Sequence, residues 1–152
     1  MKLINDLHKA YLEVDSYLSR KESRATSPRS KDIWGKRRDK NEQAYFVIMF
    51  ARFESLINDF CVALIDRKKA SSRWADRRVW QTINTEGENI RRFPFMKRVT
   101  LLIEKTSNDY QAVKKYYGLR CKIAHAETVE PIFVTVAAED LLRLIRVMKN
   151  NA

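Results

Sequence analysis

The sequence predicts an all-α protein: a bundle of four to five main helices plus one short helix, with a short extended segment before the last helix. Apolar residues recur at steps of three and four along successive segments, which is the period of a helix. Only three glycines and three prolines interrupt the chain, which suits helices joined by short connections. The 152 residues, of which 45% are hydrophobic, are enough for one core. We therefore predict a single helical domain over residues 1–152.

The first half of the chain predicts two helices and a basic loop. Residues 2–22 form the first helix, whose apolar face comprises Leu3, Leu7, Tyr11, Val14 and Leu18. Serine, threonine, proline and glycine then break the pattern, so we predict a loop over residues 23–36. Residues 38–68 form the strongest helix, with one face of Phe46, Phe50, Phe53, Ile57, Phe60 and Leu64. Further apolar residues nearly encircle it, which is typical of the centre of a bundle or of an oligomer interface.

Residues 71–84 predict a shorter helix, capped by Ser71 or Ser72. Tryptophan and arginine alternate along it, and such a pattern can bind RNA through ion pairs and stacking. The commoner arrangement places the tryptophans in the core and the arginines in solvent, and we expect that arrangement for Trp74 and Trp80. A loop follows over residues 84–93.

Three elements complete the chain. Pro94 is well placed as the first residue of a helix whose inward residues are Phe95, Val99, Leu102 and Ile103. Residues 106–109 form a break rich in capping residues before a helix over about 109–125. Residues 128–134 are extended, and Thr135 caps the last helix. One face of that helix comprises Ala137, Leu141, Leu144 and Met148.

The formal net charge of +11 favours a polyanionic partner such as RNA, DNA or an acidic protein. Cations cluster between residues 20 and 40. A basic, mobile loop there can bind a phosphate backbone, or it can be only a solvated loop, and the sequence favours neither. Within the loop, Trp34 either packs on the bundle or stacks on a base, and we expect packing.

Two cysteines, Cys61 and Cys121, lie in predicted helices without the spacing of a disulfide framework, which indicates a reducing compartment. No run approaches the roughly 20 apolar residues of a membrane span, and the first residues lack an apolar signal core. We expect a cytoplasmic protein without a membrane partner.

The candidate chemistry lies in residues 116–127. The residues Tyr110, Val113, Tyr117, Arg120 and Ala124 recur at the spacing of one inward-facing helical stripe. Arginine is almost never left unpaired in an interior. His125 follows five positions after Arg120, about 7.5 Å along the axis and rotated by about 140°. At a fraying helix end, both side chains can lean into one cleft.

Glu54 is set into the strongest helix and needs a cation if it faces inward. Arg120 and Arg52 are both candidates, and a pair with Arg120 would orient the guanidinium and leave one edge free for phosphate. Glu54 can equally be exposed on the polar side of its helix. Arg120 can also pair with Glu127, in which case His125 is a helix-end residue favoured by the helix dipole.

The run Arg120-Cys121-Lys122-Ile123-Ala124-His125 resembles the motif of the HEPN superfamily, which is arginine, a polar residue, three of any kind, then histidine. The family fold is a bundle of four or five helices, usually dimeric, and many members are metal-independent endoribonucleases of toxin, antiphage and RNA-processing systems. The resemblance implies that Arg120 and His125 are catalytic in a homodimer, with a cognate antitoxin or defence-system protein as a further partner. Cys121 stands where the family usually carries Asn, Asp or His.

The residue types fit that chemistry. Cleavage by the 2′-hydroxyl of RNA needs a proton carrier that works near neutral pH and a cation for the charged phosphorane, which histidine and arginine supply. We expect Lys122, Tyr116 and Tyr117 to contact substrate, Cys121 and Glu54 to support the catalytic pair, and no metal or cofactor. Cys121 and His125 share a helical edge, but the sequence offers too few further ligands for zinc.

The alternative is a non-catalytic module of the same fold. It binds nucleic acid or a partner protein through its basic surface, and Cys121 then marks a lost active site.

Overall fold

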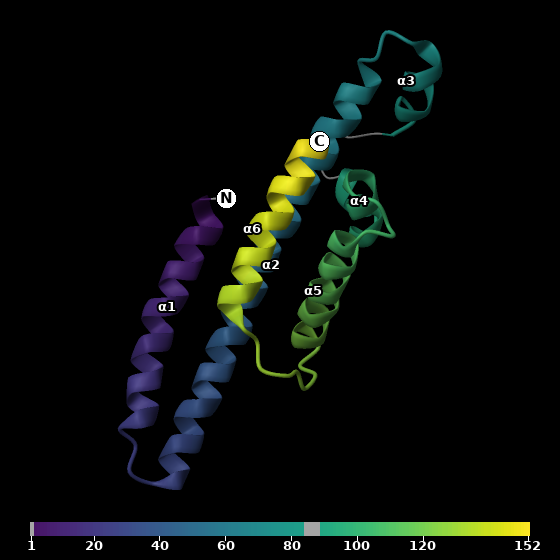
Figure 1. Ribbon diagram of the computed structural model, residues 1–152. Helices are drawn as coiled ribbons and strands as arrows, with labels where there is room; N and C mark the ends of the chain where they lie inside the picture. Colours follow the sequence, from purple (N-terminus) through teal and green to yellow (C-terminus); the bar gives the residue numbers. More distant parts are fainter. Residues whose placement is uncertain (1, 84–88) are drawn as a thin grey trace. The chain divides into compact units, whose positions relative to one another are not determined.

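The computed structural model describes residues 2–83 and 89–152, and every regular element in these ranges is helical (Figure 1), so the all-α prediction is confirmed. The elements in order are α1 (Lys2–Ser23), α2 (Pro28–Lys69), α3 (Trp74–Trp80), the 3-10 helix η1 (Asn89–Arg92), α4 (Phe95–Leu102), α5 (Asn108–Ala124) and α6 (Val134–Asn151). They form two compact units: residues 1–52 with 116–142, and residues 53–115 with 143–152. The boundaries between the units fall inside α2, α5 and α6.

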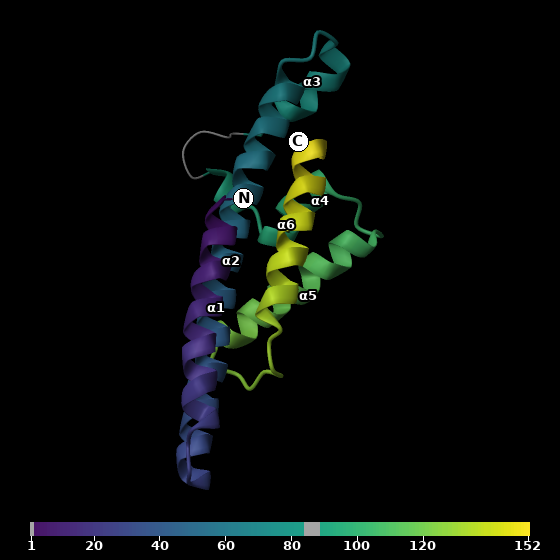
Figure 2. The same cartoon turned by 60° about the vertical axis from the view of Figure 1, so that its left-hand side comes forward.

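In the first unit, α1 and the first part of α2 form an antiparallel hairpin, seen in both Figure 1 and Figure 2. The prediction of a basic loop over 23–36 is wrong, because only residues 24–27 lie outside the two helices. Ser27 is the N-cap of α2: its Oγ accepts the N–H of Ser30 at 3.2 Å. Pro28 takes the first helical position, where its missing N–H costs nothing. The cations of this segment are therefore held on a helix.

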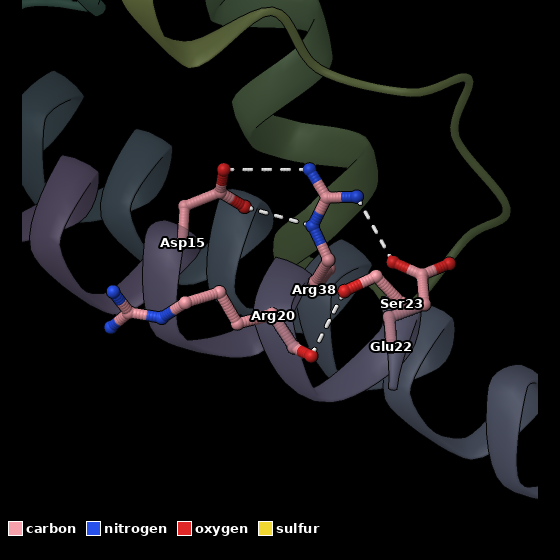
Figure 3. A network of polar contacts seen from close by, with 5 residues as sticks. All are labelled: Asp15, Arg20, Glu22, Ser23 and Arg38. Carbon is pink, nitrogen blue, oxygen red and sulfur yellow. Dashed lines mark hydrogen bonds and ion pairs between the residues drawn. The ribbon is translucent and has the colours of Figure 1, made fainter. Parts of the chain in front are cut away.

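Arg38 joins the two helices of the hairpin (Figure 3). Its guanidinium donates to both carboxylate oxygens of Asp15, at 3.0 and 3.4 Å, and to Glu22 Oε2 at 3.0 Å. These hydrogen bonds, to Asp15 first and then Glu22, raise the pKa of Arg38 above its usual value despite partial burial. Both acidic residues are on α1 and Arg38 is on α2, so the cluster orients one helix against the other.

The core of the first unit centres on the aromatic part of α2. Phe46 lies 6.1 Å from Phe50 and 6.0 Å from Tyr116 between ring centroids. The predicted α2 face is buried along its length except for Phe60, which is half-buried. On α1 the prediction is less accurate: Leu3 is 48% exposed, and its neighbour Ile4 is fully buried. One residue of error in register rotates the inward stripe by about 100°.

The second unit contains the rest of the α2 face, α4 and the end of α6. All four predicted inward residues of the α4 region are buried, as are Leu144 and Met148 of α6. Pro94 is the N-cap of α4, one position before the predicted place. Arg98 is also buried on α4. It donates to Asn58 Oδ1 through Nη1 and to Glu54 Oε1 through Nη2, the latter at 3.2 Å.

Two predictions for α3 are wrong. The helix begins at Trp74 with Arg73 as N-cap and no side-chain capping bond, while Arg77 Nη1 donates to the carbonyls of Ser71 and Ser72 at 3.0 and 2.9 Å. Trp74 is 61% exposed rather than in the core, and the guanidinium carbon of Arg78 lies over its ring, 5.0 Å from the centroid. A seven-residue helix does not have enough surface to bury both its tryptophans and its arginine stems.

Of the loop predicted over 84–93, residues 84–88 lie outside the described residues, and η1 follows directly. The predicted break before α5 is confirmed, because Ser107 Oγ accepts the N–H of Tyr110 at 3.1 Å. Residues 127–133 belong to no helix, and Val134, the last residue of the extended segment predicted over 128–134, is instead the first residue of α6. Thr135 is not the cap of α6, which begins at Val134, and its Oγ1 is instead hydrogen-bonded to His8 Nε2 at 3.0 Å.

Within residues 2–83 and 89–152, no helix combines the length and the apolar character that crossing a membrane requires.

Candidate functional site

The motif lies at the end of α5, and this end is capped rather than frayed. The N–H of Ala126 donates to the carbonyl of Ile123 at 3.0 Å, and the N–H of Glu127 donates to that of Lys122 at 2.9 Å. These two bonds form a Schellman motif, which requires a left-handed residue where Ala126 stands at φ 56°. Glycine usually occupies this position, so the sequence carried no signal for the cap. The cap holds the backbone of His125 at the last position before the chain turns away.

Arg120 is half-buried on the last turns of α5. Among the described residues its guanidinium has no hydrogen bond or ion pair. Glu54 pairs with Arg98 of the second unit and not with either predicted partner, Arg120 or Arg52, so it does not orient the guanidinium of Arg120. A half-buried guanidinium without a carboxylate keeps its donors available for an anion from solution.

The imidazole of His125 is exposed immediately after α5, and its backbone N–H donates to the carbonyl of Cys121 at 3.0 Å. Lys122 is exposed and Cys121 is half-buried. The end of α5 therefore presents a guanidinium, an ammonium and an imidazole within six residues of sequence. That set can bind a phosphate and can move a proton, which are the two operations of metal-free RNA cleavage.

The two tyrosines of the motif region have different positions. Tyr116 is buried, its hydroxyl donates to Asp140 Oδ2 of α6 at 2.6 Å, and its ring packs on Phe46. Tyr116 is therefore an interior residue, and it is not expected to contact substrate as the sequence predicts. Tyr117 is half-buried, with its ring centroid 6.3 Å from that of Phe50.

The inward stripe of α5 is rotated relative to the one predicted. Tyr110 and Val113 are buried as expected, but the line continues through Tyr116. Ala124, predicted to face inward, is exposed, and Arg120 lies at the edge of the buried face. A step of three from Val113 brings in Tyr116, and the Tyr116 hydroxyl donates to Asp140, as a buried tyrosine usually finds a partner.

The described residues contain no group of three or more His, Cys, Asp or Glu side chains arranged to hold a metal ion. Comparison of the chain with protein-family models, with curated proteins and with solved structures found no match. The function is therefore argued from the residues themselves.

Proposed function

We propose that this protein is a metal-independent endoribonuclease of the HEPN type, acting as a homodimer in a defence or toxin–antitoxin setting. The observation that carries the proposal is the end of α5. There the half-buried guanidinium of Arg120 has no acidic partner among the described residues, and the exposed imidazole of His125 follows directly after the helix. An unpaired guanidinium, followed five positions later in the chain by an accessible imidazole, suits the binding and cleavage of a phosphodiester.

The reaction uses the RNA's own 2′-hydroxyl. Its oxygen attacks the adjacent phosphorus while the bond from phosphorus to the 5′ oxygen breaks, which leaves a 2′,3′-cyclic phosphate and a 5′-hydroxyl. One imidazole accepts the proton of the 2′-hydroxyl, and a second, protonated imidazole donates a proton to the leaving oxygen. Arg120 stabilises the charge of the phosphorane. Because one chain supplies one motif histidine, the second comes from the other protomer of the dimer.

A second candidate is a non-catalytic module of the same fold that binds nucleic acid or a partner protein, such as a cognate antitoxin. Two observations favour it. Cys121 occupies the polar position of the family motif, and three exposed cations, Arg20, Lys21 and Arg24, have no acidic partner among the described residues. In this function Arg120, Lys122 and His125 contribute only to binding.

The deciding experiment is cleavage of labelled single-stranded and structured RNAs in EDTA. Wild type is compared with Arg120→Ala, His125→Ala and the matched control Lys114→Ala, which removes one exposed cation from the same helix. We expect products with cyclic-phosphate ends, a rate reduced by about 100-fold or more in the two motif variants, and an unchanged rate in the control.

Three results would count against the enzyme. Intact RNA with wild type under all conditions leaves the binding module as the function. Cleavage that survives both motif substitutions places the chemistry elsewhere. A monomer in analytical ultracentrifugation at the concentration of the assay removes the second imidazole.

A further inference from the structure

The end of α1 and the first residue of the turn after it form an exposed face that the proposed chemistry does not use. We call it the α1 basic face, and it consists of Tyr17, Arg20, Lys21 and Arg24. These four residues line a shallow hollow of about 340 Å³. Tyr17 is 49% exposed, and Lys21 Nζ lies 5.5 Å from its ring centroid. The face therefore combines an accessible aromatic ring with three cations.

The acidic residues of the hairpin do not neutralise these cations. Asp15 and Glu22 are both bound by Arg38, and Asp32 is bound by Lys36 at 2.7 Å. In Figure 3 the guanidinium of Arg20 points away from that network, to which it contributes only its carbonyl, the acceptor for Ser23 Oγ at 3.0 Å. Among the described residues, Arg20, Lys21 and Arg24 have no carboxylate partner. Asp15, Glu22 and Asp32 are thus paired with Arg38 and Lys36, whereas the three cations of the α1 basic face remain in solvent.

The cations and the aromatic ring of the α1 basic face together favour one class of ligand. Arg24 directly follows α1, and its N–H still donates to the carbonyl of Arg20 at 3.2 Å, as in a further helical turn. The two guanidinium groups therefore begin about one turn apart, and each can reach a different phosphate group of one strand. A ring beside cations suits a strand whose bases are unpaired, because a stacked duplex hides its base faces from an aromatic side chain. An acidic protein segment would satisfy the cations but gives no reason for the exposed ring.

We propose that the α1 basic face binds single-stranded RNA, with phosphates on Arg20, Lys21 and Arg24 and one base stacked on Tyr17. The choice of RNA as the strand rests on the proposed endoribonuclease function. The binding itself requires neither Arg120 nor His125.

The test is fluorescence anisotropy of a labelled twelve-nucleotide oligouridylate with the full chain carrying His125→Ala, so that binding is read without cleavage. The triple variant Arg20→Ala, Lys21→Ala, Arg24→Ala is compared with an equally charged control, Lys97→Ala, Arg146→Ala, Lys149→Ala, all exposed. We expect Kd to rise about tenfold or more in the first triple variant only. The slope of log K against log salt should fall by about 2, since three phosphate contacts are lost.

Tyr17 separates base stacking from charge. We expect Tyr17→Ala to raise Kd about fivefold or more and Tyr17→Phe, which keeps the ring, to leave it unchanged. An RNA duplex of the same length should bind more weakly than the single strand.

Equal weakening by both triple variants would overturn the proposal, because the binding would then follow net charge and not this face. Tighter binding of the duplex, or an unaffected Tyr17→Ala, would also overturn it. If the oligonucleotide does not bind at 50 mM salt, the proposal is also overturned, and an acidic protein becomes the expected partner of this face. Single-strand binding that depends on this face in a chain that cleaves no RNA would refute the endoribonuclease and not this site.

Discussion

Substitution of the buried Arg98 tests how much its hydrogen bonds contribute to the stability of the second unit. Its side chain is only 6% exposed, and its guanidinium serves Asn58 and Glu54 of α2. Its backbone carbonyl accepts the thiol of Cys61 at 3.3 Å, and the Phe95 ring centroid lies 5.5 Å from its guanidinium carbon. The substitution Arg98→Met keeps most of the apolar stem and removes the guanidinium alone.

The expected cost follows from what each partner loses. Asn58 is 8% exposed, and its carbonyl oxygen would remain buried without a donor, at about 1–3 kcal/mol. The Glu54 side chain is 25% exposed, so water replaces much of the lost ion pair and the further cost is at most about 1 kcal/mol. Arg98 Nε has no hydrogen bond within the described residues, so removing this buried polar atom offsets part of the free-energy cost of the substitution. We expect the free energy of unfolding to fall by about 2–3 kcal/mol.

The assay is urea unfolding followed by circular dichroism, with Arg146→Met as the control, because Arg146 is an exposed cation on α6. The control should change stability by less than about 0.5 kcal/mol. In an Asn58→Ala background, Arg98→Met should cost about 1 kcal/mol less than in wild type, since the buried oxygen is already gone. If Arg98→Met cost no more than the control, the reasoning would be refuted, because Arg98 would then be neither buried nor bound.

Three further predictions test the ends and the interior of the helices. Ala126→Gly should raise the free energy of unfolding by about 0.5–1 kcal/mol, because glycine adopts the left-handed cap conformation without strain, and this gain exceeds its larger loss of chain entropy on folding. The midpoint of thermal unfolding should rise by about 2–4 °C, and a lower midpoint would contradict the left-handed cap. Burial raises the pKa of Glu42, and only in part does the hydrogen bond from the backbone of Ile132 oppose this. The folded state therefore holds the proton more tightly than the unfolded chain, and its stability falls as the pH rises through that raised pKa. Glu42→Gln should accordingly stabilise the protein at pH 7 and lose that advantage below about pH 4, as urea midpoints at the two pH values would show; equal midpoints at pH 7 would argue against a buried carboxyl. Burial also raises the pKa of the Cys61 thiol to about 12, whereas Cys121 is half-buried, so iodoacetamide at pH 8 should label only Cys121 in the folded protein and both residues in urea, as peptide mass spectrometry would reveal.

Local patterns predicted much of the fold. The apolar faces of α2, α4 and α6 follow from helical spacing, since the chain needs only its own geometry to bring residues three and four apart onto one side. The start of α2 was missed although its signal was present. Ser27 followed by Pro28 is a capping residue and a first-position proline, the usual opening of a helix. The loop prediction over residues 23–36 interprets the same Ser27-Pro28 pair as a turn signal.

At the motif, the sequence predicts a helix over about 109–125 that includes both Arg120 and His125, and the structure has α5 end between them at Ala124. The cap at Ala126 could not be predicted, because alanine in a left-handed position leaves no trace in composition. Tyr116 is buried and Ala124 is exposed, and the hydroxyl of Tyr116 is bound by Asp140, which lies 24 residues away on α6.

The sequence by itself determined the helical class, most of the inward faces and the positions of the two motif residues. Only the tertiary structure decided which charges pair. Glu54 binds Arg98, 44 residues away, and Asp15 binds Arg38, 23 residues away. Helical periodicity is a property of a few consecutive residues, and so it can be read locally. A guanidinium, in contrast, pairs with whichever carboxylate packing brings near, and that depends on the helices that meet. For the same reason only the structure separated the cations that stabilise the hairpin from those left free for a partner.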